Sequence, residues 1–138
     1  MLLDTHVWIW LVGDESRQLG PRTRRQLAKA TGYRAASVST VSAFEIAALH
    51  TAGRLQLSQP VERWIANSIE RAGFKVIDIE RDIAVDAGMI PAAALPDPFD
   101  RCLVATAREY AVPLVTRDRR ILDYAKDTGL VQVIDASV

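Results

Sequence analysis

Short apolar segments typical of buried strands alternate with longer helix-like segments along the chain, and this alternation constrains the fold more than any other feature. Strand patterns cover residues 2–5, 35–40, 74–79, 113–116 and 131–134. Helix patterns cover residues 6–12, 21–30, 41–50, 61–71, 80–88, 98–110 and 119–126. Strands separated by helices pair in parallel, and the helices then cover both faces of the sheet. The sequence therefore predicts a three-layer α/β/α fold with a central parallel sheet, as a single domain over residues 1–138.

The composition excludes several classes of protein. A chain of 138 residues with 49% hydrophobic positions can bury a core without disulfides, and the single cysteine, Cys102, rules out an internal one. Lys+Arg and Asp+Glu both number 17, so the net charge is zero, which argues against binding to DNA or a membrane through the overall charge of the protein. The longest uncharged stretches, residues 35–44 and 87–96, are far shorter than the about 20 apolar residues of a membrane span. Because no secretory signal is visible either, we expect a cytoplasmic protein.

Acidic residues stand where predicted strands give way to helices. Asp4 ends the first strand, Glu45 lies in the first turns after the second, and Asp118 follows the fourth. Asp97 and Asp100 open the helix that starts at residue 98. Ligands of open parallel sheets bind beyond the carboxyl ends of the strands. We therefore predict that these carboxylates meet in one site, although the sequence does not specify the order of the strands.

Helix capping is the alternative interpretation of the same residues. Asp is among the best N-caps, so Asp4, Asp97 and Asp118 could each satisfy free N–H groups at the start of a helix. Ser42 and Glu45 have the spacing of a capping box. Spacing alone does not separate capping from a shared site.

The surroundings of two of the acids favour a shared site. Asp4 is the only charged residue among the first 13, and Glu45 is the only one between residues 35 and 53. A carboxylate buried without a cation costs several kcal/mol, and neither segment supplies a cation of its own. A divalent ion would neutralise several converging acids, and oxygen-only ligands select Mg²⁺ or Mn²⁺ rather than zinc.

Three segments resemble the PIN-domain ribonucleases, and more narrowly the VapC-like toxins of bacterial toxin–antitoxin pairs. They read LLDTHVW at residues 2–8, STVSAFEIAALHTAGRLQL at 39–57 and DPFDRCLVATAREYAVPLVTRD at 97–118. Their order and spacing follow the family over nearly the whole chain. By motif, the family's four acidic positions correspond to Asp4, Glu45, Asp100 and Asp118. Asp97 is an additional carboxylate that either binds metal or caps its helix.

The resemblance implies an endoribonuclease toxin that hydrolyses RNA phosphodiester bonds with Mg²⁺ or Mn²⁺. The metal would polarise the scissile phosphate and activate a water molecule. Asp4, Glu45 and Asp100 would be metal ligands, directly or through water, and Asp118 a ligand or a base that orients water. The family also implies a homodimer and a cognate antitoxin that silences the acidic site. The alternative function is a catalytically inactive PIN-like module that binds RNA or a protein.

Other residues have less specific signals. Thr5 and Thr116 match hydroxyl positions beside the family's acids and are candidates to orient an acid or a water molecule. Two sets of basic residues are candidates to bind RNA: the six between positions 17 and 34, and the arginines nearest the acids, Arg101, Arg117, Arg119 and Arg120. Both sets fit an ordinary solvated surface equally well.

The aromatic residues of the predicted helices give no sign of nucleic-acid binding. Trp8, Trp10 and Trp64 lie in apolar helices without interleaved Lys or Arg. We interpret all three as core or interface residues. His6, two positions after Asp4, is likewise interpreted as packed or hydrogen-bonded rather than as a metal ligand.

Overall fold

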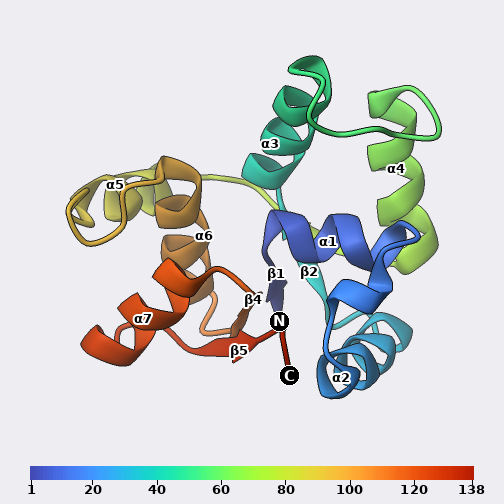
Figure 1. Ribbon diagram of the computed structural model, residues 1–138. Helices are drawn as coiled ribbons and strands as arrows, with labels where there is room; N and C mark the ends of the chain where they lie inside the picture. Colours follow the sequence, from blue (N-terminus) through green and yellow to red (C-terminus); the bar gives the residue numbers. More distant parts are fainter.

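A five-stranded parallel sheet lies at the centre of the protein, with helices on both faces, in a computed structural model that describes residues 1–138 (Figure 1). The strands are β1 (Leu2–Leu3), β2 (Ser37–Ser39), β3 (Lys75–Ile77), β4 (Leu114–Thr116) and β5 (Val133–Asp135). Their order is β3-β2-β1-β4-β5, and every neighbouring pair is parallel. The predicted three-layer α/β/α fold is confirmed.

Seven α-helices connect and cover the strands. They are α1 (Thr5–Val12), α2 (Pro21–Gly32), α3 (Thr40–Thr51), α4 (Val61–Ala72), α5 (Arg81–Met89), α6 (Pro98–Glu109) and α7 (Arg119–Thr128). Each corresponds to a predicted helix within a few residues, whereas the 3₁₀ turn η1 (Ser16–Gln18) has no counterpart in the prediction. None of these helices has the length and hydropathy needed to cross a bilayer.

Successive residues of the central strands point into opposite cores, as the two-residue period of a strand requires. Leu3 of β1 and Val115 of β4 join the core beneath α1, α2, α3 and α4. Leu2 and Leu114, their immediate neighbours, join the core beneath α6 and α7. Figure 1 shows α1, α2 and α4 on one side of the sheet, and α6 and α7 on the other. Both faces of the central strands are therefore covered, which explains their continuous apolar sequence.

Trp8 anchors α1 in the first of these cores. Its side chain is fully buried and packs against Trp64 and Phe74, at 6.1 and 6.3 Å between ring centroids. Its Nε1–H donates to Ser68 Oγ of α4 at 3.0 Å, so the polar edge of the indole is satisfied inside the core. The prediction of core positions for Trp8 and Trp64 is confirmed. A helix anchored in this way holds the residues at its start in fixed positions.

Candidate active site

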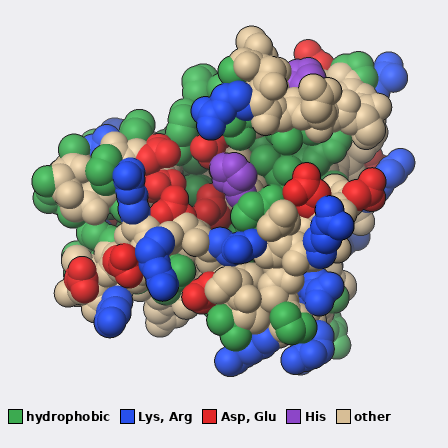
Figure 2. Space-filling view, viewed as in Figure 1, with side chains coloured by type: hydrophobic (Ala, Val, Ile, Leu, Met, Phe, Trp, Pro, Cys, Tyr) green, Lys and Arg blue, Asp and Glu red, His purple; other side chains and the backbone are tan.

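The strand order places the sequence-predicted acids at one point of the sheet. The chain runs outward from β1 to β3 on one side and from β4 to β5 on the other, so β1 and β4 flank the point where the winding reverses. Crevices at such points are the usual ligand sites of open α/β sheets. A pocket of about 260 Å³ lies there, lined by Asp4, His6, Trp10, Glu45, Asp97, Asp100, Arg117 and Asp118. Figure 2 shows acidic side chains gathered beside a histidine near the middle of this face.

Asp4 is fixed by the sheet and by a threonine of the neighbouring strand. Its N–H donates to Val115 O at 3.0 Å, and its side chain is 7% exposed. The carboxylate does not cap α1, as the alternative interpretation required, but accepts a hydrogen bond of 2.6 Å from Thr116 Oγ1. The same hydroxyl accepts the N–H of Asp118 at 2.9 Å. Thr116 therefore fixes Asp4 and Asp118 relative to each other. The sequence had made Thr116 a candidate for orienting an acid.

A second hydroxyl pair positions the helix that carries Glu45. The N-cap of α3 is Ser39, whose Oγ accepts the N–H of Val41 at 3.1 Å. The capping box suggested by the sequence is not formed, because Ser42 lies inside the helix and its Oγ accepts from Thr5 Oγ1 at 2.9 Å. This buried hydrogen bond joins the first turns of α1 and α3. Thr5 thus orients a helix rather than an acid, and Glu45 is left without a capping role.

Asp97 and Asp118 combine both interpretations, because each caps a helix and lines the pocket. Asp97 Oδ1 accepts the N–H of Phe99 at 2.8 Å at the start of α6. Asp118 Oδ1 accepts the N–H of Arg120 at 2.8 Å at the start of α7. Each cap uses one carboxylate oxygen and leaves the other without a hydrogen bond from the protein. Capping therefore does not remove these residues from the pocket.

Five carboxylates lie around this pocket, and two of them, Asp4 and Asp100, are buried. Asp100 is 9% exposed, and burial together with the negative charges of Asp97, Asp4, Asp118 and Glu45 raises its pKa to about 8. Burial also raises the pKa of Asp4; the Thr116 hydrogen bond and nearby His6 oppose the rise, and Glu45 adds to it. Without a bound cation, burial and the neighbouring negative charges therefore favour the protonated form of Asp100.

The donor set suits a hard divalent cation. The ion pairs of the protein are Arg81–Asp82 and Arg108–Asp86, so no acid of the pocket is paired with a Lys or Arg. Five carboxylates without a cationic partner offer only oxygen ligands, which favour Mg²⁺ or Mn²⁺. As the side chains lie, no group of three or more is arranged to hold an ion. One oxygen each of Asp4, Asp97 and Asp118 is engaged by a hydrogen bond within the protein and the other is left for an ion, so binding would require only side-chain rotations within the pocket.

Two aromatic residues of the pocket lie side by side. Trp10 is half-buried, packs against the core beneath α1 and lines the pocket beside His6, with 5.7 Å between the ring centroids. Arg117 Cζ lies 5.4 Å from the centroid of the Trp10 ring. Residues four apart share one face of a helix, so the positions of His6 and Trp10, in a helix that begins directly after Asp4, carried a signal that they face the same site.

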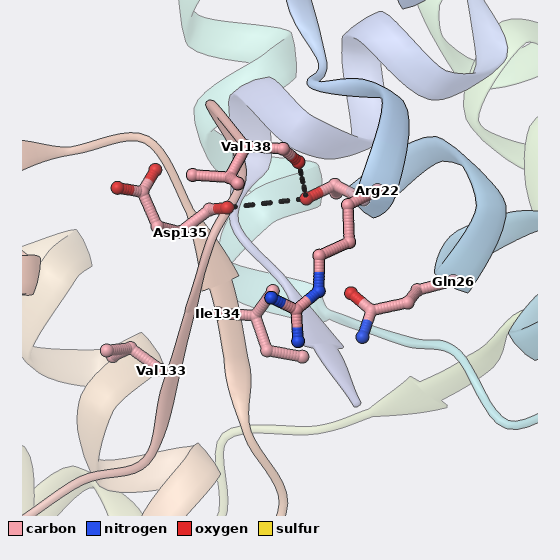
Figure 3. Close-up of a pocket in the computed structure, with 7 residues that line it drawn as sticks. Arg22, Gln26, Val133, Ile134, Asp135 and Val138 are labelled. Atoms are coloured by element: carbon pink, nitrogen blue, oxygen red, sulfur yellow. Dashed lines mark hydrogen bonds between the residues drawn. The ribbon is translucent and has the colours of Figure 1, made fainter.

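A second hollow, between α2 and β5, lacks these features. It is lined by residues of α2 and of the last strand and its extension, namely Arg22, Thr23, Gln26, Val133, Ile134, Asp135 and Val138. Figure 3 shows the Asp135 carboxylate turned away from Arg22 and Gln26. With a single carboxylate that points elsewhere, this hollow does not provide a set of metal ligands.

The three-layer fold is consistent with that of a PIN domain, and the model of that family, described as PIN domain, matches residues 1–127. The chain belongs to the PIN-domain family. Among curated proteins it is similar to Ribonuclease VapC22 of Mycobacterium tuberculosis, with 33% identity over 121 residues, which are 88% of each chain. The resemblance to the VapC-like ribonucleases of this family is confirmed.

Two solved structures have the same fold at low sequence identity. One is a toxin–antitoxin complex from Klebsiella pneumoniae, with a TM-score of 0.58 and 21% identity over 96% of this chain and 94% of the other. The second is VapBC2 from Rickettsia felis bound to a DNA fragment from its promoter, with a TM-score of 0.67 and 12% identity over 96% of each chain. At these identities the likeness concerns the fold.

Proposed function

We propose that this protein is a Mg²⁺- or Mn²⁺-dependent endoribonuclease that acts as the toxin of a toxin–antitoxin pair. The observation that carries the proposal is the set of five carboxylates around one pocket at the carboxyl ends of β1 and β4. The PIN-domain match and the similarity to Ribonuclease VapC22 support RNA as the substrate. The two solved complexes with the same fold support an antitoxin as partner. The protein acts in the cytoplasm, where its RNA substrate lies, and forms a homodimer.

In this proposal the acids divide the work between holding the ion and orienting water. Asp4, Asp100 and Glu45 are metal ligands, directly or through water, and Asp118 is a further ligand or orients the attacking water. Asp97 adds a ligand through the oxygen that its helix cap leaves free. A bound divalent cation neutralises charge on the scissile phosphate and lowers the pKa of water, which makes a nucleophilic side chain unnecessary.

The hydroxyl pairs supply the rigidity that this chemistry needs. Thr116 keeps the Asp4 carboxylate in place through the 2.6 Å hydrogen bond, and the 2.9 Å bond between Thr5 and Ser42 fixes the helix of Glu45 against α1. Loss of a hydrogen-bond partner of a metal ligand, such as Thr116, typically lowers metal affinity or activity by about 10- to 100-fold. The apo protein therefore presents ligands on fixed backbones, with only side-chain rotations left to ion binding.

The test is cleavage of a mixed pool of RNA by the purified protein with Mg²⁺, with Mn²⁺ and with EDTA. Asp4→Asn and Asp100→Asn are expected to lose more than about 100-fold in cleavage rate, because each removes a ligand charge without changing the size of the side chain. Asp127→Asn is the matched control, since Asp127 is exposed on α7 and does not line the pocket. Cleavage in EDTA, or by Asp4→Asn at the wild-type rate, would refute the metal-dependent mechanism. RNA binding without cleavage under all conditions would identify an inactive binding module instead.

A further inference from the structure

The acidic pocket has a single Lys or Arg among its lining residues, Arg117. A pocket of carboxylates repels the phosphates of RNA, so the strand needs a cationic contact beside the acids. Resting on the proposed ribonuclease function, we infer that Arg117 binds a backbone phosphate of the substrate, with Trp10 and Gln18 holding its guanidinium in position. Arg117 is thus a substrate-binding residue, and Trp10 and Gln18 are positioning residues.

The guanidinium of Arg117 is held by neutral groups. Arg117 directly follows β4, and its Nη1 donates to the backbone O of Gln18 at 2.6 Å and to Gln18 Oε1 at 3.2 Å. On a second side, Cζ lies 5.4 Å from the centroid of the Trp10 ring, within the about 6 Å range of a cation–π contact. Two consecutive elements that are distant in sequence from Arg117, α1 and η1, therefore fix the orientation of this arginine before any substrate binds.

Arg117 has no carboxylate partner at ion-pair distance in the protein, although Asp118 is its neighbour in the chain and five acids line the same pocket. Its hydrogen bonds within the protein involve Nη1 alone, so Nε and Nη2 remain free to donate. These two nitrogens form the fork that matches the oxygens of a phosphate group, and the side chain is exposed to solvent.

The structure distinguishes Arg117 from the other arginines near the acids. Arg101, Arg119 and Arg120 do not line the pocket. Arg101 Nε is also buried and has no hydrogen-bond partner in the protein. Among the arginines that the sequence suggested beside the acids, only Arg117 lines the pocket.

A phosphate contact predicts a particular kind of binding defect. Contacts to the backbone fix the position of a strand but carry no sequence information, so their loss weakens binding to all sequences equally. Each phosphate contact also contributes to the salt dependence of binding, by about 0.7 in the slope of log K against log salt concentration for a single strand. A residue with a merely structural role would change neither property.

The experiment measures the affinity of the full-length protein for two fluorescein-labelled single-stranded RNAs of unrelated sequence, of about 12 nucleotides each, in EDTA so that no cleavage occurs. Arg117→Gln is expected to weaken binding of both RNAs by about tenfold and to lower the salt slope by about 0.7. Arg117→Lys keeps the charge but loses the paired guanidinium donors. It is therefore expected to have the wild-type salt slope and an affinity between those of the wild type and Arg117→Gln. In Mg²⁺, Arg117→Gln raises KM for cleavage more than it lowers kcat.

Arg63→Gln is the matched control, since it removes an exposed arginine on α4 that does not line the pocket. It is expected to bind both RNAs with the wild-type slope. The inference is overturned if Arg117→Gln has the same slope and affinity as Arg63→Gln, or if it differs only by a lower melting temperature. If the wild type cleaves RNA and Arg117→Gln binds and cleaves it equally well, only this inference is refuted. If the wild type neither binds nor cleaves RNA, the proposed function is refuted as well.

Discussion

The Thr116 hydroxyl donates a hydrogen bond of 2.6 Å to the Asp4 carboxylate, across 112 positions of sequence. Both residues are buried, and they stand at the ends of the adjacent strands β1 and β4. The bond favours the ionised form of Asp4 and so opposes the rise in pKa that burial causes. A single hydroxyl thus keeps a buried carboxylate ready to bind a cation.

Replacing Thr116 tests this relationship directly. Thr116→Val keeps the shape of the side chain but removes both the bond to Asp4 and the acceptor for the Asp118 N–H. Mn²⁺ affinity is expected to fall by about 10- to 100-fold, as for other residues that support metal ligands. Thr116→Ser keeps the hydroxyl and is expected to stay near the wild type. Isothermal titration with Mn²⁺ measures both, and equal affinities for the Val and Ser variants would show that the hydroxyl is unimportant.

The raised pKa of Asp100 predicts how the stability of the metal-free protein depends on pH. Its folded-state value of about 8 lies above the ordinary value of 3.8, so the folded protein binds more protons than the unfolded chain between these values. The stabilising contribution is complete below about pH 4 and is lost as the pH rises toward 8. Urea unfolding in EDTA at a series of pH values is expected to show this decline.

Asp100→Asn provides the matching control for the pH dependence, because the amide cannot ionise. Its free energy of unfolding in EDTA is expected to decline less with pH than that of the wild type and to exceed it at pH 8. Asp127→Asn, outside the pocket, is expected to follow the wild-type profile. Coincident profiles for Asp100→Asn and the wild type would contradict the buried, mutually repelling arrangement of the carboxylates.

Divalent cations are expected to raise the melting temperature of the wild type. A ligand that binds only the folded state stabilises it by about 2.7 kcal/mol at a concentration 100 times its Kd. The shift with Mg²⁺ or Mn²⁺ is expected to disappear on adding EDTA and to be much smaller in Asp4→Asn, which lacks one ligand charge. Differential scanning calorimetry measures it, and an equal shift in Asp4→Asn would place the bound ion elsewhere on the protein.

The buried hydrogen bond between Trp8 and Ser68 gives a prediction about stability alone. Ser68→Ala leaves the indole N–H of Trp8 without a partner inside the core, which is expected to cost about 1–3 kcal/mol. Ser58→Ala, at an exposed position before α4, is expected to be within about 0.5 kcal/mol of the wild type. Denaturant unfolding followed by tryptophan fluorescence measures both, and equal stabilities would show that the bond contributes nothing.

Residue patterns in the sequence predicted some of the residues around the pocket and missed others. The five carboxylates singled out at strand ends and helix starts all line one pocket, although their roles as ligands stay a prediction. Trp10 packs against the core, but it also lines the pocket, and the apolar sequence around it does not reveal that one face of α1 borders the pocket. Gln18 gave no signal at all, since its contact with Arg117 joins residues 99 positions apart.

The sequence by itself determined the helices, the strands and the position of each acid at the end of a strand or in the first turns of a helix. These features follow from the local period of apolar residues and from turn and capping residues, which act over a few positions. The tertiary structure alone decided that β1 lies between β2 and β4, that Asp4 bonds to Thr116 rather than capping α1, and that Arg117 lies over Trp10. The physical reason is that strand order and side-chain partners depend on the packing of segments distant in sequence, which no local pattern encodes.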